Sequence, residues 1–256
     1  MTGTTAATVR PGTRVRVALA LAWAGLLLAL GCGVMELLSG LGYRWGWWPL
    51  RSGIQILRWS ATTGLAAAAL TLAGMLLALT SGVRRAFGLG ALGLVLSLAA
   101  VGPPLYYWRL LDQVPRVHDI STDTENPPQF VAVLPLRRNA ENPADYNAGD
   151  AAQQKKAYPD ILPARLDLPA PQALQRAERI AREMGWDIVA VAPQDLRIEA
   201  TDTTLLFGFK DDVVIRVAPA GRGSRVDVRS VSRIGKSDFG VNARRIRKFM
   251  QLLATA

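Results

Sequence analysis

Charged side chains recur at every second position along most of residues 225–233, RVDVRSVSR, as in a strand with two different faces. Arg229 and Arg233 fall on the same face, and their planar guanidinium groups suit a phosphate or a carboxylate. A helix is expected soon after this strand, because Ser237 or Asp238 can cap its first turn. The free N–H groups at a helix start also favour anions. The candidate anion-binding residues are therefore Arg229, Arg233, Ser237, Asp238, Gly240 and Asn242.

The same residues also have a purely structural interpretation. In it, Asn242 locks the turn between strand and helix, and both arginines form ion pairs within the fold. The partners of the arginines would then be Asp227, Asp238 or Asp211. The sequence leaves both interpretations open, because a guanidinium group binds a carboxylate of its own chain as readily as one from a ligand.

Asp202, Asp211 and Asp212 form a close acidic group, and paired carboxylates can bind a hard cation or perform acid–base chemistry. Salt bridges to arginines on a neighbouring strand explain the group equally well. His118 is the single histidine of the chain, which argues against histidine-containing triads and multi-histidine metal sites. We therefore expect no metal, no cofactor and no catalytic set of residues.

The composition of the chain changes sharply near residue 108. Residues 1–108 contain long apolar runs, eight basic residues and one acidic residue, Glu36, whereas residues 109–256 contain 22 basic and 19 acidic residues. Most of the net charge of +10 therefore flanks apolar segments, where lysine and arginine meet anionic lipid. Membrane lipid is the expected partner, and nucleic acid is not expected.

Three apolar runs are long enough to cross a bilayer, which takes about 20 helical residues. After an N-terminal tail at 1–16, we expect membrane helices at about 17–38, 59–80 and 86–108. The tryptophan-rich stretch 41–59 is expected to be an interfacial loop or a short in-plane helix. The expected interface residues are Trp45, Trp47, Trp48, Trp59, Tyr106, Tyr107 and Trp108.

Residues 109–167 contain many prolines and little periodicity, so we expect an extended, wrapping linker with one short edge strand at 129–134. Residues 168–256 alternate between patterns of helix and strand, which predicts a soluble α+β domain. The whole is then a membrane-anchored α+β protein, with three N-terminal transmembrane helices and an antiparallel sheet flanked by two helices. Helices are expected at 171–185 and after Asp238, and strands at 186–192, 196–201, 205–209, 213–218 and 225–233.

The last half of the chain is similar to a known family. Residues 229–246, RSVSRIGKSDFGVNARRI, resemble the C-terminal signature of the domain of unknown function 1499 family, roughly R-S-x-S-R-x-G-x-S-D-x-G-x-N-x-x-R-I. Residues 207–217, FGFKDDVVIRV, resemble the preceding strand pair, and residues 126–130, NPPQF, the opening segment. The resemblance implies the family variant in which several helices precede the domain, and it implies no activity.

The orientation in the membrane follows from weaker signals. Three helices put the two ends of the chain on opposite sides, and five basic residues fall on each side, so the positive-inside rule does not decide. The short Arg84-Arg85 turn and the N-terminal arginines favour a cytoplasmic N-terminus. The resemblance implies an exported domain. We therefore expect a multi-pass protein of the cytoplasmic (inner) membrane with a periplasmic C-terminal domain.

The leading functional hypothesis is a non-enzymatic envelope protein whose exported domain binds a protein partner or an anionic amphiphile. One alternative is a membrane-associated enzyme that acts on a lipid-linked substrate through Asp211, Asp212 and the arginines. Another is a structural subunit of a membrane complex, built on the glycine-rich faces of the helices. Cys32 lies in an apolar run and is interpreted as a small helix residue, with lipoprotein processing as the alternative.

Overall fold

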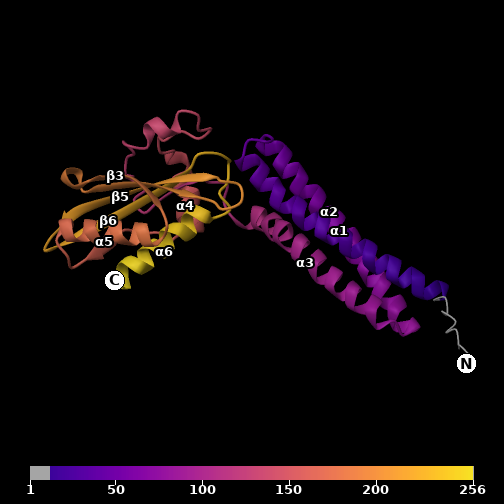
Figure 1. Cartoon of the computed structure of the whole chain (residues 1–256). Coiled ribbons are helices and arrows are strands. Elements are labelled where there is room, and N and C mark those ends of the chain that lie inside the picture. The colour runs from indigo at the N-terminus through magenta and orange to yellow at the C-terminus, as the bar shows by residue number, and fades with distance from the viewer. Residues whose placement is uncertain (1–11, 256) are drawn as a thin grey trace, which may run out of the picture. The chain divides into compact units, whose positions relative to one another are not determined.

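The computed structural model describes residues 12–255, except for the side chains of residues 111 and 112 (Figure 1). The chain divides between Arg109 and Leu110 into two compact units. Most of the expected N-terminal tail, residues 1–11, lies outside the described residues. The remainder of that tail is helical from Thr13 onward.

In the part of the chain that the structure describes, the first unit is built from three long helices. These are α1 (Thr13–Arg44), α2 (Leu50–Ser81) and α3 (Arg84–Gln113). All three are long and apolar enough to cross a membrane, as judged from length and composition. A helix suits a bilayer because it satisfies its backbone N–H and C=O groups internally.

Each helix is longer than the apolar run that predicted it. The stretch 41–59 is not an interfacial loop, because α1 continues to Arg44 and α2 already begins at Leu50. Pro103 and Pro104 lie inside α3 and do not end it. Hydropathy marks where a helix can cross lipid, whereas arginine and glutamine are good helix formers that extend it beyond that point.

Small residues let the three helices approach closely. A Cβ atom added at Gly25 of α1 or at Gly93 of α3 would lie 2.5 Å from Cγ2 of Thr71 in α2. A Cβ atom at Gly74 would lie 2.9 Å from the backbone nitrogen of Ala22. The three helices therefore meet around Thr71, and packing of this kind drives helix association where water is absent.

The second unit contains an antiparallel sheet with strand order β1-β6-β5-β4-β3, and β2 also pairs with β6. Helices α5 (Ala170–Glu183) and α6 (Val241–Thr255) cover one face of this sheet (Figure 1). The strands are β1 (Asp119–Ser121), β2 (Ala164–Leu166), β3 (Asp187–Ala192), β4 (Arg197–Thr203), β5 (Lys210–Ala220) and β6 (Gly223–Ser232).

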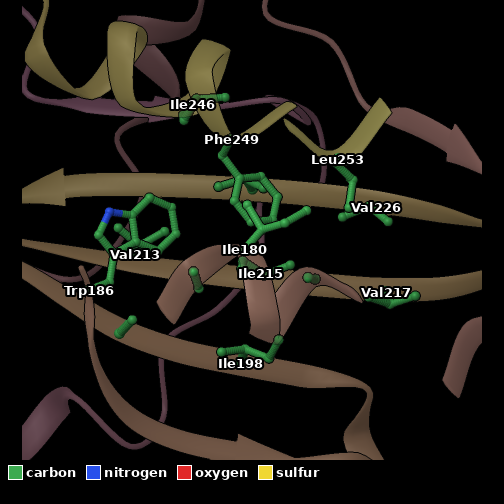
Figure 2. Close-up of a cluster of buried hydrophobic side chains, with 14 of the residues drawn as sticks. Ile180, Trp186, Ile198, Val213, Ile215, Val217, Val226, Ile246, Phe249 and Leu253 are labelled. Carbon is green, nitrogen blue, oxygen red and sulfur yellow. The ribbon is translucent and has the colours of Figure 1, made fainter. Parts of the chain in front are cut away.

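The apolar core lies between this face of the sheet and the two helices (Figure 2). The rings of Trp186 and Phe249 stack with their centroids 5.5 Å apart and an angle of 19° between their planes. Ile180 of α5 and Val213 of β5 pack in the same cluster. Alternate positions of β5 and β6 face the core, as the period of two in their sequences predicts. Also drawn in Figure 2 are Ile198, Ile215, Val217, Val226, Ile246 and Leu253.

The opposite face of the sheet is covered by residues 122–147, which we call the strap. The strap contains the short 3₁₀ helix η1 (Leu134–Arg137). The expected edge strand at 129–134 is wrong, because these residues form turns that lead into η1. A second 3₁₀ helix, η2 (Ala148–Asp150), and helix α4 (Ala151–Ala157) follow the strap.

The expected strand at 205–209 is also wrong, because these residues form the loop between β4 and β5. The N–H groups of Gly208 and Phe209 donate to the carbonyl and hydroxyl oxygens of Thr204, at 3.0 and 2.8 Å. Gly208 has a φ of 67°, a conformation that glycine adopts without steric cost. The third 3₁₀ helix, η3 (Pro193–Asp195), connects β3 to β4.

Candidate functional site

Strand β6 separates two chemically different surfaces. Val226 and Val228 face the helices and belong to the apolar core. The alternate residues face the strap, and three of them are charged: Arg225, Asp227 and Arg229. Arg233, just after the strand, continues this face. The candidate site on the strap side must therefore be built from carboxylates and guanidinium groups, and its properties depend on how these groups are paired.

Arg229 is completely buried beneath the strap. Its Nε and Nη2 atoms donate to the carboxylate of Asp119 on β1, with Nη2 2.6 Å from Oδ2. Its remaining N–H groups donate to the backbone carbonyls of Pro128 and Ala144 in the strap, at 3.2 and 2.6 Å. Two rings of the strap also face this guanidinium group, from Phe130 at 5.0 Å and Tyr146 at 5.3 Å.

A second buried carboxylate, Asp212 on β5, is shared by two arginines. Arg137 of η1 approaches Oδ2 at 2.5 Å, and Arg233 donates to both carboxylate oxygens, at 2.8 and 2.9 Å. The Thr201 hydroxyl donates to Oδ1 at 2.7 Å. Burial alone would raise the pKa of Asp212, but these hydrogen bonds outweigh burial and lower that pKa below 3.8.

Glu199 on β4 is the third buried carboxylate on this face. Its two oxygens accept the backbone N–H groups of Val131, Ala132 and Val133, all at 3.0 Å. Its Oε1 atom also accepts Arg197 Nε at 2.9 Å. A carboxylate at the start of a helical turn satisfies N–H groups that have no partner within that turn. Glu199 thus fixes the middle of the strap on the sheet.

Asp227 anchors the beginning of the strap. Its carboxylate accepts Arg216 at 3.0 Å and Arg225 at 2.9 Å. Both arginines also reach Asp123 of the strap, at 3.1 and 2.8 Å. The hydroxyl of Thr122 lies 3.5 Å from Asp227 Oδ1. This cluster lies nearer the surface than the other three, since both arginine side chains are partly exposed.

The first residues of α6 lie on the side of the sheet that helices α5 and α6 cover. The carboxylate of Asp238 caps the helix, accepting the N–H groups of Gly240 and Asn242 at 2.8 and 2.7 Å. Burial raises the pKa of Asp238, although these two N–H donors oppose the effect. The Asn242 side chain accepts the Ser230 hydroxyl at 2.7 Å. The Ser237 hydroxyl lies 3.4 Å from the Pro115 carbonyl oxygen.

The structure does not bring the six predicted anion-binding residues into one site. Arg229 and Arg233 lie on the strap side, whereas Asn242 bonds to Ser230, which lies on the helix side of the same strand. The two faces of a strand are separated by its backbone. The Asp238 carboxylate also occupies the N–H groups of the helix start, where an anion would otherwise bind.

The predicted acidic group is divided in the same way. Asp202 and Asp211 are cross-strand neighbours, and Arg245 of α6 binds both of them, at 2.8 and 2.6 Å. Asp212 points to the other face, to Arg137. Within residues 12–255, no three histidine, cysteine or acidic side chains come together in a way that could hold a metal ion.

The predicted interface aromatics fall into three places in the helical unit. Trp45, Trp47 and Trp48 lie in the turn between α1 and α2, where their rings contact one another in sequence. Trp59 lies inside α2 and is largely exposed. Near the end of α3, Tyr106, Tyr107 and Trp108 are exposed, with the two tyrosine rings 5.7 Å apart.

Three residues that hold the strap were not among the predicted site residues: Asp119, Arg137 and Glu199. Asp119 and Glu199 each adjoin a buried isoleucine of a strand, Ile120 and Ile198, and a charged residue in such a place signals burial with a partner. Arg137 carries no such signal. All three act through partners more than 60 residues away in the chain.

These features define a chain with three membrane-capable helices and a separate α+β domain, whose sheet carries helices on one face and an ion-paired strap on the other. Residues 119–253, more than half of the chain, match the family described as "Protein of unknown function (DUF1499)", and the chain belongs to this family. The motif around Arg229 and Asn242 therefore indicated the correct family. No curated protein matches the chain.

Proposed function

We propose that this chain is a non-enzymatic, membrane-anchored protein of the cell envelope, whose family domain binds a protein partner or an anionic amphiphile. The observation that carries the proposal is that the buried carboxylates, which could otherwise perform chemistry, form hydrogen bonds and ion pairs within the fold. The carboxylates of Asp119, Glu199 and Asp212 are each held by two or more donors that fasten the strap or join strands. Groups held in this way support a rigid binding surface.

The strap offers the surface for such binding. Val131, Leu134 and Leu136 are exposed on it, although Glu199 and Arg233 below hold its backbone in place. Apolar side chains on a rigid surface lose little conformational freedom on binding, which favours an apolar or amphipathic ligand. Residues 109–256 carry a net charge of +3, which favours an anionic one.

The proposed location is the cytoplasmic (inner) membrane, with the family domain on the periplasmic side. Alkaline phosphatase fused after residue 256 should be active, since this reporter works only outside the cytoplasm, and green fluorescent protein at the same position should be dark. Fusions within the α2–α3 turn, at Gly82, should give the reverse pattern. Bright green fluorescent protein at the C-terminus would contradict the location.

The binding function is tested by affinity purification of the full chain in mild detergent, followed by mass spectrometry of lipids and proteins. A matched variant, Leu134→Ser with Leu136→Ser, changes exposed side chains and leaves the buried ion pairs intact. The proposal expects a lipid or protein that is enriched with the native chain and lost with the variant. Turnover of a lipid-linked substrate that stops in folded Asp212→Asn would instead support an enzyme.

A further inference from the structure

The loop between β4 and β5, residues 204–209, has the sequence TLLFGF and carries four large apolar residues. Leu205 has 87% of its surface exposed, the largest fraction among the exposed apolar residues described. The rings of Phe207 and Phe209 stack with centroids 5.0 Å apart and remain partly exposed. Thr204 accepts hydrogen bonds from the backbone N–H groups of Gly208 and Phe209. These bonds close the loop as a turn, so its apolar side chains are carried on an ordered backbone.

This loop lies at the end of the sheet where the chain enters from α3. Asp211, just after the loop, pairs with Ser232 of β6, and the Ser232 N–H donates to the carbonyl of His118 at 2.9 Å. The β5–β6 hairpin at Gly221 and Arg222 lies at the other end, about 30 Å along the strands.

The connection from α3 limits how far the loop end of the domain can lie from the apolar run of that helix. The apolar run of α3 ends in the aromatic residues up to Trp108, and α3 itself ends at Gln113. One further helical turn and six extended residues place Asp119 within about 30 Å of Trp108. A bilayer spanned by α3 is therefore within reach of this end of the sheet.

Three exposed basic residues lie at the same end of the sheet as the apolar loop. Lys210 directly follows it and Lys236 lies in the turn after β6, and both are exposed. These segments are joined, because the N–H of Arg233 donates to the carbonyl of Lys210 at 3.0 Å. Arg116, in the connection from α3, is exposed as well. Exposed apolar residues with basic side chains at the same end of a domain are the pattern that binds the interface of anionic bilayers.

We propose that the β4–β5 loop inserts into the interface of an anionic bilayer, with Leu205 deepest and with Lys210 and Lys236 on the lipid headgroups. The contact gives the family domain a second attachment besides α3, and it sets which end of the sheet faces the membrane. The inference goes beyond the proposed function, and it requires only that the apolar helices span a bilayer.

The test uses the full chain with Cys32→Ala, which removes the single native thiol, in vesicles of equal parts phosphatidylglycerol and phosphatidylcholine. Leu205→Cys and, as the matched control at the far end, Arg222→Cys carry the same polarity-sensitive nitrobenzoxadiazole label. The label at 205 should emit at shorter wavelength and be quenched at least threefold more strongly by spin-labelled lipid than the label at 222. Equal quenching at both positions would overturn the proposal.

Two further arms identify what covers the loop. Lys210→Glu with Lys236→Glu, or vesicles of phosphatidylcholine alone, should reduce lipid quenching of the 205 label at least twofold. Shielding of that label from iodide without quenching by lipid would mean that protein covers the loop, and it would also overturn the proposal. Lipid quenching of the label does not depend on which side of the membrane the domain faces, and it needs no ligand. This result is therefore independent of the tests of the proposed location and binding function.

Discussion

Arg229 and Asp119 form a buried ion pair that joins β6 to β1, with Nη2 of the arginine 2.6 Å from Oδ2 of the aspartate. Two other N–H groups of the same guanidinium bind strap carbonyls on either side, at Pro128 and Ala144. One side chain therefore holds a strand and both halves of the strap. This arrangement explains why the conformation of residues 122–147 can be fixed although they contain little regular structure.

The first prediction concerns this pair. Arg229→Ala should destabilise the domain by about 3–5 kcal/mol, because removing one partner leaves the carboxylate of Asp119 buried and unpaired. The measurement is pulse proteolysis of the detergent-solubilised full chain over a urea series. As a control, Arg247→Ala breaks the more exposed pair with Asp160 and should cost at most about 1 kcal/mol. Similar costs for the two variants would show that Arg229 does not hold the fold.

The second prediction concerns Glu199. Glu199→Gln keeps the size of the side chain but removes its charge and turns an amide group toward N–H donors. Hydrogen exchange at Val131, Ala132 and Val133 should accelerate by roughly 10- to 150-fold, since hydrogen bonds to charged groups contribute about 1.5–3 kcal/mol. Mass spectrometry of the exchanged peptides measures this rate.

The matched control for Glu199 is Glu178→Gln, which alters a partly exposed carboxylate that binds Arg182 on α5. Exchange in the strap should be unchanged in this variant. Faster exchange throughout the domain in Glu199→Gln, rather than in the strap, would contradict a local role for this residue.

The regular elements of the domain could be predicted because their signals are local. Helix α5 has a proline at its start, apolar residues at helical spacing and Gly185 just beyond its end. The two faces of β6 follow from the alternation of its residues. The loop 204–209 was misassigned because its apolar residues resemble a strand, whereas Thr204 and Gly208 close it as a turn.

The strap could not be predicted, because side chains distant in sequence satisfy its backbone. The N–H groups of Val131 and Val133 bind Glu199, and periodicity carries no information about such contacts. The candidate anion site failed to assemble for a related reason. Closeness in sequence placed Arg233 next to Asp238, but it did not reveal that α6 packs on the face opposite the arginines.

The third prediction is a loss of stability in acid. The pKa of Asp212 is lower in the fold than the ordinary value of 3.8, so its charged form stabilises the fold above that value. As the pH falls from about 4 through the folded pKa, protonation removes this contribution. Urea midpoints measured between about pH 6 and pH 3 should therefore decrease, and less steeply in Asp212→Asn.

Asp123 also has a lowered pKa, because backbone N–H groups and Arg225 outweigh its burial, so the Asp212→Asn variant should keep part of the pH dependence. A slope in this variant equal to that of the native chain would show that Asp212 does not contribute. Asp160 contributes to the remaining pH dependence as well, because its hydrogen bonds to Arg247 lower its pKa.

The fourth prediction concerns helix packing in the apolar unit. Gly74→Leu should separate α1 from α2, because even a Cβ atom there lies 2.9 Å from the backbone nitrogen of Ala22 and 3.2 Å from the Ala18 carbonyl oxygen. The expected result is a midpoint of thermal unfolding in detergent lowered by several degrees, measured by circular dichroism. Gly33→Leu is the matched control, because no atom lies within 4 Å of its added Cβ and leucine favours a helix more than glycine does. A lower midpoint for Gly33→Leu than for Gly74→Leu would contradict the packing around Thr71.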